Sequence, residues 1–87
     1  MEIHQIRYFL AVCDQGNFTR AAQLSYVSQP SLTQAIKKLE DEMGGTLLTR
    51  DRSGCQLTAL GALLNPICAK YIKIFWVQKP KPFASPA

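Results

Sequence analysis

The chain has 87 residues, the length of one domain, and its hydrophobic content of 47% is typical of a folded chain and excludes a disordered one. A domain this small buries too little surface to enclose an ordinary catalytic cleft, and no nucleophile–base pair, metal-ligand cluster or phosphate-cradling glycine loop occurs, so no enzyme is expected. The net charge of +4 comes entirely from Lys70, Lys73, Lys79 and Lys81, because the basic and acidic residues of 1–58 cancel. Any positively charged face must therefore arise from local segregation of charge.

Three features bear on the compartment. The N-terminus lacks a basic segment followed by a long apolar run, and no uninterrupted apolar stretch of about 18 residues is present to span a bilayer. Cys13, Cys55 and Cys68 are odd in number and form neither a CxxC pair nor a disulfide framework. We therefore expect a cytoplasmic protein with no membrane segment, no metal and no other cofactor.

A first helix is predicted over about residues 3–15, because apolar residues from Ile3 to Cys13 recur at helical spacing and Gly16 supplies a stop. Asn17 is then a suitable N-cap for a second helix that begins near Thr19, with Phe18 as an anchor just outside it.

Residues 17–40 are the most informative part of the chain, because they predict two helices joined by a tight turn. Ala21, Ala22 and Leu24 are the expected buried positions of the short helix, and the two alanines allow a close crossing. Ser28 is the expected N-cap of the next helix, residues 29–42, with Pro30 in its first turn. Its buried stripe consists of Leu32, Ala35, Ile36 and Leu39. The opposite face carries hydrogen-bonding and basic side chains suited to the DNA major groove, namely Gln29, Ser31, Thr33, Gln34, Lys37 and Lys38.

A β-hairpin is predicted after this helix, with strands near residues 46–50 and 56–58 around a turn at 51–54. Such a hairpin behind a helix-turn-helix is a wing. Thr58 is a plausible N-cap for a last helix, which carries a broad apolar stripe and contains Pro66. Because the stripe exceeds what the domain needs to cover itself, we expect it to pair with a second copy, with core packing and an amphipathic membrane contact as alternatives.

Taken in order, these segments resemble the DNA-binding domain of the LysR-type transcriptional regulators over residues 3–66. The matching positions are 6–12, 18–22, Leu24, 27–33, Ile36, 39–40, Gly44, the wing sequence 47–50, and 57–58 with Gly61 and Pro66. So many matches in order, at uninterrupted spacing, are far more specific than a helix-turn-helix pattern alone.

The resemblance implies a mainly α fold, with a winged helix-turn-helix over residues 1–58 and a linker helix over 59–78. The three prolines among the last ten residues separately predict a proline-rich, unstructured tail over 79–87. It implies sequence-specific binding of double-stranded DNA as a transcriptional regulator, with helix 29–42 in the major groove and the wing on the minor groove or backbone. The implied base-reading residues are Gln29, Pro30, Ser31, Thr33 and Gln34. The implied backbone and wing contacts are Thr19, Arg20, Lys37, Arg50, Arg52 and Ser53. The implied homodimer forms through the linker helix at Leu60, Leu63, Leu64, Ile67 and Tyr71.

Two departures from the family pattern carry expectations. Position 34 is often arginine in relatives, and Gln34 offers an amide better suited to adenine than to guanine, so we expect a shifted base preference there. Relatives carry an effector domain after the linker helix, whereas residues 74–87 do not resemble its start, so no small-molecule effector site is expected in this chain. A fragment, a truncated product and a free-standing protein are all compatible with the sequence. The alternative function is a protein-interaction module that heterodimerises with a full-length regulator.

Four isolated residues belong to types that often have chemical roles, but their sequence contexts give such roles little support. His4 is expected to be a solvated surface residue, and Ser28 a helix cap with no base to activate it. Cys13 is expected to be buried, and Cys55 to be exposed on the wing, with a redox role as its alternative.

Overall fold

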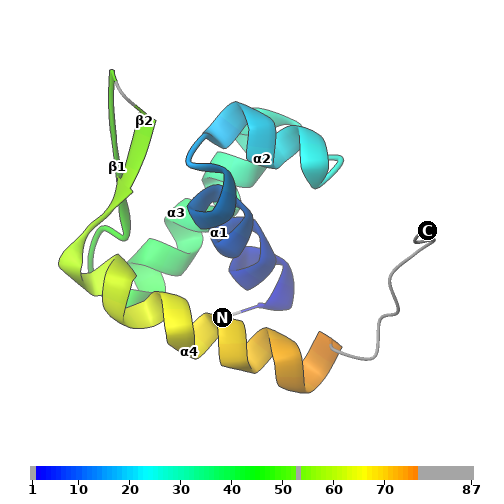
Figure 1. Cartoon of the computed structure of the whole chain (residues 1–87), viewed down its shortest axis with the longest axis vertical. Helices are drawn as coiled ribbons and strands as arrows, with labels where there is room; N and C mark the ends of the chain where they lie inside the picture. Colours follow the sequence, from blue (N-terminus) through cyan, green and yellow to red (C-terminus); the bar gives the residue numbers. More distant parts are fainter. Residues whose placement is uncertain (1, 53, 77–87) are drawn as a thin grey trace.

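The computed structural model describes residues 2–52 and 54–76, which form four helices and one β-hairpin. In chain order these are α1 (Ile3–Gln15), α2 (Phe18–Leu24), α3 (Gln29–Met43), β1 (Leu48–Asp51), β2 (Gly54–Leu57) and α4 (Ala59–Trp76). In Figure 1, α1 lies in the centre, the hairpin projects at the upper left, and α4 runs along the lower edge. The predicted winged helix-turn-helix followed by a long helix is confirmed.

Both ends of α1 are defined by the residues that flank it. The backbone N–H of Glu2 donates to the Gln5 side chain at 3.0 Å, and the Glu2 side chain accepts from the first turn, which together make a capping box. Gly16 ends the helix with φ 65°, a left-handed conformation that favours glycine, and its N–H donates to the Val12 carbonyl at 2.7 Å. The predicted bounds of this helix are confirmed.

The short helix α2 differs from the prediction at both ends. Asn17 is its N-cap and accepts from the Arg20 N–H at 2.8 Å, but Phe18 is the first helical residue and belongs to the core, rather than lying outside the helix. The prediction that Leu24 is buried is wrong, since this side chain is 58% exposed. Because α2 ends at Leu24, no further helical turn packs over it. Ala21 and Ala22 are buried, so the close approach to α3 rests on them.

Helix α3 begins as the sequence predicts and ends one residue later, at Met43. The Ser28 Oγ accepts from the Ser31 N–H at 3.2 Å, and Pro30 lies in the first turn. Its predicted stripe of Leu32, Ala35, Ile36 and Leu39 is buried. The core therefore gathers side chains from all four helices and from the base of the hairpin, namely Ile6, Phe9, Val12, Phe18, Ala21, Ala22, Leu32, Ile36, Leu39, Leu47, Leu48, Leu64 and Cys68.

The hairpin is antiparallel, with Leu48 opposite Leu57 and Asp51 opposite Gly54. Its strands are shifted from the prediction, because residues 46–47 belong to the loop after α3 and Thr58 serves α4 instead. The Thr58 hydroxyl donates to the Thr46 carbonyl at 2.5 Å and accepts from the Gly61 N–H at 3.0 Å. One threonine thus caps α4 and ties it to the base of the hairpin.

At position 61, α4 lies close against the base of the hairpin. A methyl group there would collide with the backbone carbonyl oxygen of Leu47 and with the Leu57 side chain. Only glycine fits this contact, which sets how α4 crosses the hairpin base. Pro66 lies inside α4, and the helix continues through it to Trp76.

The last two residues of the predicted linker helix and the predicted tail, residues 77–87, lie outside the described residues. Among the helices that are described, none has the length and apolar character that crossing a bilayer would require.

Candidate nucleic-acid interface

The exposed ridge of α3 and the first strand of the hairpin together form one open depression. Its lining comes from Gln29, Pro30, Thr33, Gln34 and Lys37 on α3 and from Arg50 on β1. We call the five α3 residues the reading face, and β1, β2 and the turn between them the wing. Four of the five predicted base-reading residues therefore lie together, beside a guanidinium of the wing.

Ser31, the fifth predicted base-reading residue, lies on the other side of α3. Its backbone N–H donates to Ser28, and its hydroxyl accepts from the Ser28 hydroxyl at 2.9 Å. It lines a separate pocket with residues of α1. Ser31 is exposed, but its polar groups also serve the N-cap of α3.

A hydrogen bond from α2 orients the first residue of the reading face. The Thr19 hydroxyl donates to the Gln29 Oε1 at 3.3 Å. Since the amide oxygen is engaged, Gln29 presents its amino group as a donor, which suits acceptors on base edges. Thr19 therefore orients a residue of the reading face in addition to lying next to that face. Arg20 is exposed on α2.

Arg50 joins the wing to both helices of the helix-turn-helix. Its Cζ lies 3.8 Å from the centre of the Phe18 ring, and its Nη2 donates to the Thr33 hydroxyl at 3.4 Å. A guanidinium stacked on an aromatic ring keeps further N–H donors for other partners. The family resemblance implies a DNA-backbone contact for Arg50, and the structure adds that its guanidinium connects β1 with both α2 and α3.

Glu40 is a positioning residue that the sequence analysis did not single out. Its Oε2 accepts from the backbone N–H groups of Leu47 at 2.8 Å and of Leu48 at 3.3 Å. This carboxylate therefore holds the start of β1 against the last turns of α3. Glu40 was noted only as part of the family match, since a contact between a helix and the loop seven residues later has no local signature.

The tip of the wing carries the remaining predicted backbone contacts. Arg52 is exposed between the two strands. Ser53 lies outside the described residues. Lys37, Arg50 and Arg52 place basic groups along the reading face and the wing, whereas Asp41 and Glu42 lie in the last turns of α3, away from Gln29.

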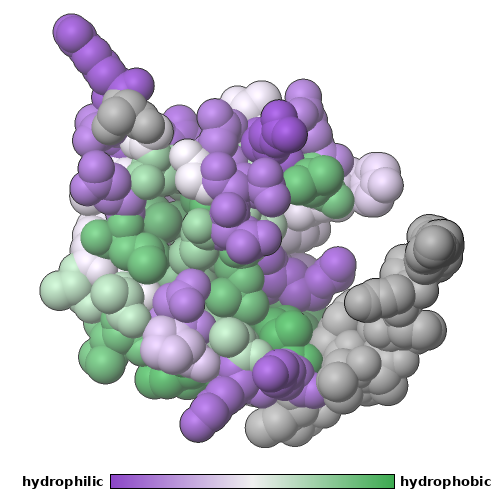
Figure 2. Space-filling model, in the orientation of Figure 1, coloured by the Kyte–Doolittle hydropathy of each residue, from purple (hydrophilic) through white to green (hydrophobic). Residues whose placement is uncertain are grey.

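The apolar stripe of α4 divides into two faces. Leu64 and Cys68 are 7% and 1% exposed and complete the protomer's own core, while Leu60 and Tyr71 are half-buried against it. Leu63 and Ile67 point outward, at 65% and 55% exposed. Leu64 and Cys68 fit the alternative of core packing, because α4 lies across α1 and the hairpin base, whereas Leu63 and Ile67 leave the predicted dimer seam open. Figure 2 shows hydrophobic residues gathered over the part of the surface that α4 occupies, with hydrophilic ones at the wing.

All three cysteines are free thiols that are at least partly buried. Cys13 and Cys55 are half-buried, so the first is less buried and the second more buried than expected, and Cys68 is buried. Burial raises the pKa of the Cys13 and Cys55 thiols, and raises the pKa of Cys68 to about 11. A raised pKa lowers the thiolate fraction, so Cys55 lacks the activation that a redox role requires.

The arrangement defines a class: a winged helix-turn-helix in which an exposed polar helix face and a basic hairpin meet. The family model for the bacterial regulatory helix-turn-helix protein, lysR family, matches residues 3–62. The chain belongs to this family.

Curated relatives and solved structures agree with that assignment. The chain is 48% identical over 61 residues to the HTH-type transcriptional regulator TfdT of Cupriavidus pinatubonensis, covering 70% of this chain and 27% of TfdT. It is 49% identical over 61 residues to the Hca operon transcriptional activator HcaR of Escherichia coli, covering 70% of this chain and 21% of HcaR. The crystal structure of the CbnR_DBD–DNA complex matches with a TM-score of 0.82 and 36% identity over 86% of each chain. The chain thus spans about a quarter of the length of these two curated relatives.

Proposed function

We propose that this chain binds double-stranded DNA sequence-specifically, as the DNA-binding part of a LysR-type transcriptional regulator. The observation that carries the proposal is the shared depression of the reading face and Arg50, which presents amides, hydroxyls and cations on one surface. The similarity to the CbnR_DBD–DNA complex supports it. We propose no enzymatic activity, and we place the protein in the cytoplasm, where a bacterial regulator meets its operator.

In this proposal α3 enters the major groove and the wing lies on the adjacent backbone or minor groove. Gln29, Pro30, Thr33 and Gln34 read base edges, and Ser31 contributes at the margin. Thr19, Arg20, Lys37, Arg50, Arg52 and Ser53 contact the backbone. Gln34 donates and accepts toward adenine, which gives this chain a base preference different from that of a relative with arginine there.

We propose that two copies bind a partly symmetric operator through α4. Leu63 and Ile67 support this, since two large apolar side chains one helical turn apart remain exposed on its outer face. The unit that binds DNA is proposed to be residues 1–58, with residues from 59 to 78 as the dimerisation helix and 79–87 as a tail. The same exposed pair favours the second candidate function, heterodimerisation with a full-length regulator.

Fluorescence anisotropy with two duplexes tests the proposal. One duplex carries the DNA that flanks the chain's own gene, the other a random sequence, and both are titrated from low to physiological salt. We expect tight binding that weakens steeply with salt and favours the native flank, because phosphate contacts release counterions and base contacts add preference. Binding that is insensitive to salt would reject the DNA proposal and leave the docking module.

A further inference from the structure

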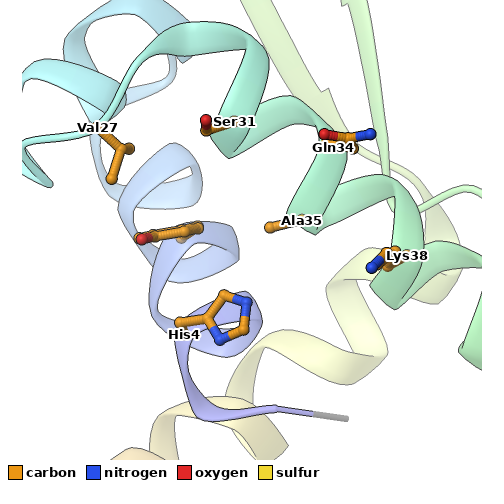
Figure 3. A pocket seen from close by; sticks show the side chains of 7 residues that line it. His4, Val27, Ser31, Gln34, Ala35 and Lys38 are labelled. Carbon is orange, nitrogen blue, oxygen red and sulfur yellow. The ribbon is translucent and has the colours of Figure 1, made fainter.

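A second polar pocket flanks α3 on the side opposite the wing. Figure 3 shows His4 on α1 facing α3, with Ser31, Gln34 and Lys38 on successive turns of α3. Tyr8, Val27 and Ala35 complete the lining, and we call this the α1-side pocket. Gln34 lines both this pocket and the depression beside the wing. The ridge of α3 that carries Gln34 therefore stands between two depressions.

The α1-side pocket is rich in groups that donate hydrogen bonds. Lys38 is exposed and supplies an ammonium group, while Ser31 and Tyr8 supply hydroxyls. His4 is held in place by two contacts: its Nδ1 lies 3.5 Å from Glu2 Oε1, and its ring meets Tyr8 edge-on with centroids 5.7 Å apart. The carboxylate that faces this histidine belongs to Glu2, and His4 pairs with it at the edge of the pocket.

Two of the proposed backbone contacts, Thr19 and Arg50, lie on one side of α3. Thr19, Gln29 and Arg50 line a common depression with Asn17 and Gly54, which places α2's first turn and the wing on the same flank of the helix. A helix in the major groove has a sugar–phosphate backbone on each side of it. The flank of α3 that faces α1 carries neither of these two backbone contacts.

We propose that the α1-side pocket binds a backbone phosphate on the strand across the major groove from the wing. Lys38 supplies the cation from α3, and His4 and Tyr8 supply hydrogen-bond donors from α1. The inference rests on the proposed function and extends it to a second phosphate strand. It also assigns the two adjacent lysines to different phosphate strands, with Lys37 toward the wing and Lys38 toward α1.

The test compares Lys38→Ala with Lys70→Ala, an exposed lysine on α4, and adds Tyr8→Phe, which removes one hydroxyl and keeps the ring. Circular dichroism verifies folding. Binding to the native flank is followed by anisotropy across a salt series, and phosphate ethylation interference maps the backbone contacts on both strands.

For Lys38→Ala we expect the slope of log K against log salt to fall by about one, with base preference unchanged. Ethylation interference should disappear at a phosphate across the groove from the wing and persist on the wing side. Tyr8→Phe should weaken binding to all duplexes a few-fold, and Lys70→Ala should match the unaltered chain. A Lys38→Ala variant whose slope and interference pattern match those of Lys70→Ala would overturn the inference and leave the proposed function standing. Salt-insensitive binding by the unaltered chain would overturn both.

Discussion

The reading face and the outer face of α4 differ in polarity and in how the rest of the domain supports them. The reading face is polar, and its neighbours hold it in place: Thr19 engages Gln29, and Arg50 bridges Phe18 and Thr33. The outer face of α4 is apolar, and Leu63 and Ile67 have most of their surface in water. One surface is therefore organised within a single protomer, while the other has an energetic reason to be covered by something else. Substitutions should therefore be able to affect one surface without affecting the other.

Gly61→Ala should damage both faces at once, because it forces α4 away from the hairpin base. The added methyl meets the Leu47 backbone carbonyl, which cannot rotate aside. We expect a loss of about 3 kcal/mol in unfolding free energy, measured by urea denaturation. Ala62→Ser, at an exposed neighbouring position, should stay within about 0.5 kcal/mol of the unaltered chain. Equal stability of Gly61→Ala would mean that α4 is free to shift.

A pair of charges on α4 should break the outer face alone. Leu63→Lys with Ile67→Lys should leave the fold intact, since both side chains are exposed, and should yield monomers in sedimentation-velocity measurements. Affinity for a two-half-site operator should fall about 100-fold through lost avidity, with half-site binding retained. A Leu64→Ala variant should instead lose stability, because that side chain is in the core. Dimers that persist in the lysine variant would locate the seam elsewhere.

Glu40→Gln should disturb the wing and spare α4. The carboxylate accepts from two backbone N–H groups, and a neutral amide makes weaker bonds to them. We expect a loss of about 1–2 kcal/mol in stability by thermal denaturation, together with weaker DNA binding. Asp41→Asn, at the exposed position next to it, serves as the control and should change stability little.

Within the reading face, Gln29→Ala and Arg52→Ala should have different signatures. Gln29→Ala should lower discrimination between native and random duplexes about tenfold, the order expected for one good base contact. Arg52→Ala should weaken binding to every sequence and reduce the salt slope by about one. Competition titrations at fixed salt distinguish the two. A Gln29→Ala variant that loses specific and non-specific affinity equally would remove this residue from base reading.

The smallest effect concerns the buried thiol on the inner face of α4. Burial raises the pKa of Cys68 to about 11, so the folded state keeps its proton at a pH where the unfolded chain has released it. The folded state therefore binds more protons between about pH 9 and 11, and stability must fall as pH rises through that window. We expect this decline to be about 1 kcal/mol smaller in Cys68→Ala, in which Cys13 and Cys55, whose pKa values burial also raises, still contribute. Parallel stability–pH slopes for the two proteins would contradict this.

Local signals account for much of the fold. Caps at Asn17, Ser28 and Thr58 and the stop at Gly16 are chemical features of single residues, so the helix starts and stops were predictable from them. The buried stripe of α3 follows from its spacing, and so does the polar ridge opposite it. Four of the predicted base-reading residues therefore lie together in the structure.

The features that sequence reasoning missed depend on contacts between distant segments. Nothing near Glu40 indicates that it will accept from Leu47, and nothing near Arg50 indicates that Phe18 will lie beneath its guanidinium. The apolar residues of α4 recur at one helical spacing but lie in two environments. The rest of the domain packs on only one side of the helix, so Leu64 is buried and Leu63 is exposed. Periodicity identifies a face, while tertiary packing decides how much of it remains free.

The most direct measurement is a ¹⁵N–¹H chemical-shift map of the chain titrated with the native-flank duplex. The account predicts the largest amide shifts along Gln29 to Lys37 and from Arg50 to Arg52, with small changes at Leu63 and Ile67 beyond those that dimerisation causes without DNA. Shifts concentrated on the outer face of α4, with the reading face unchanged, would contradict it.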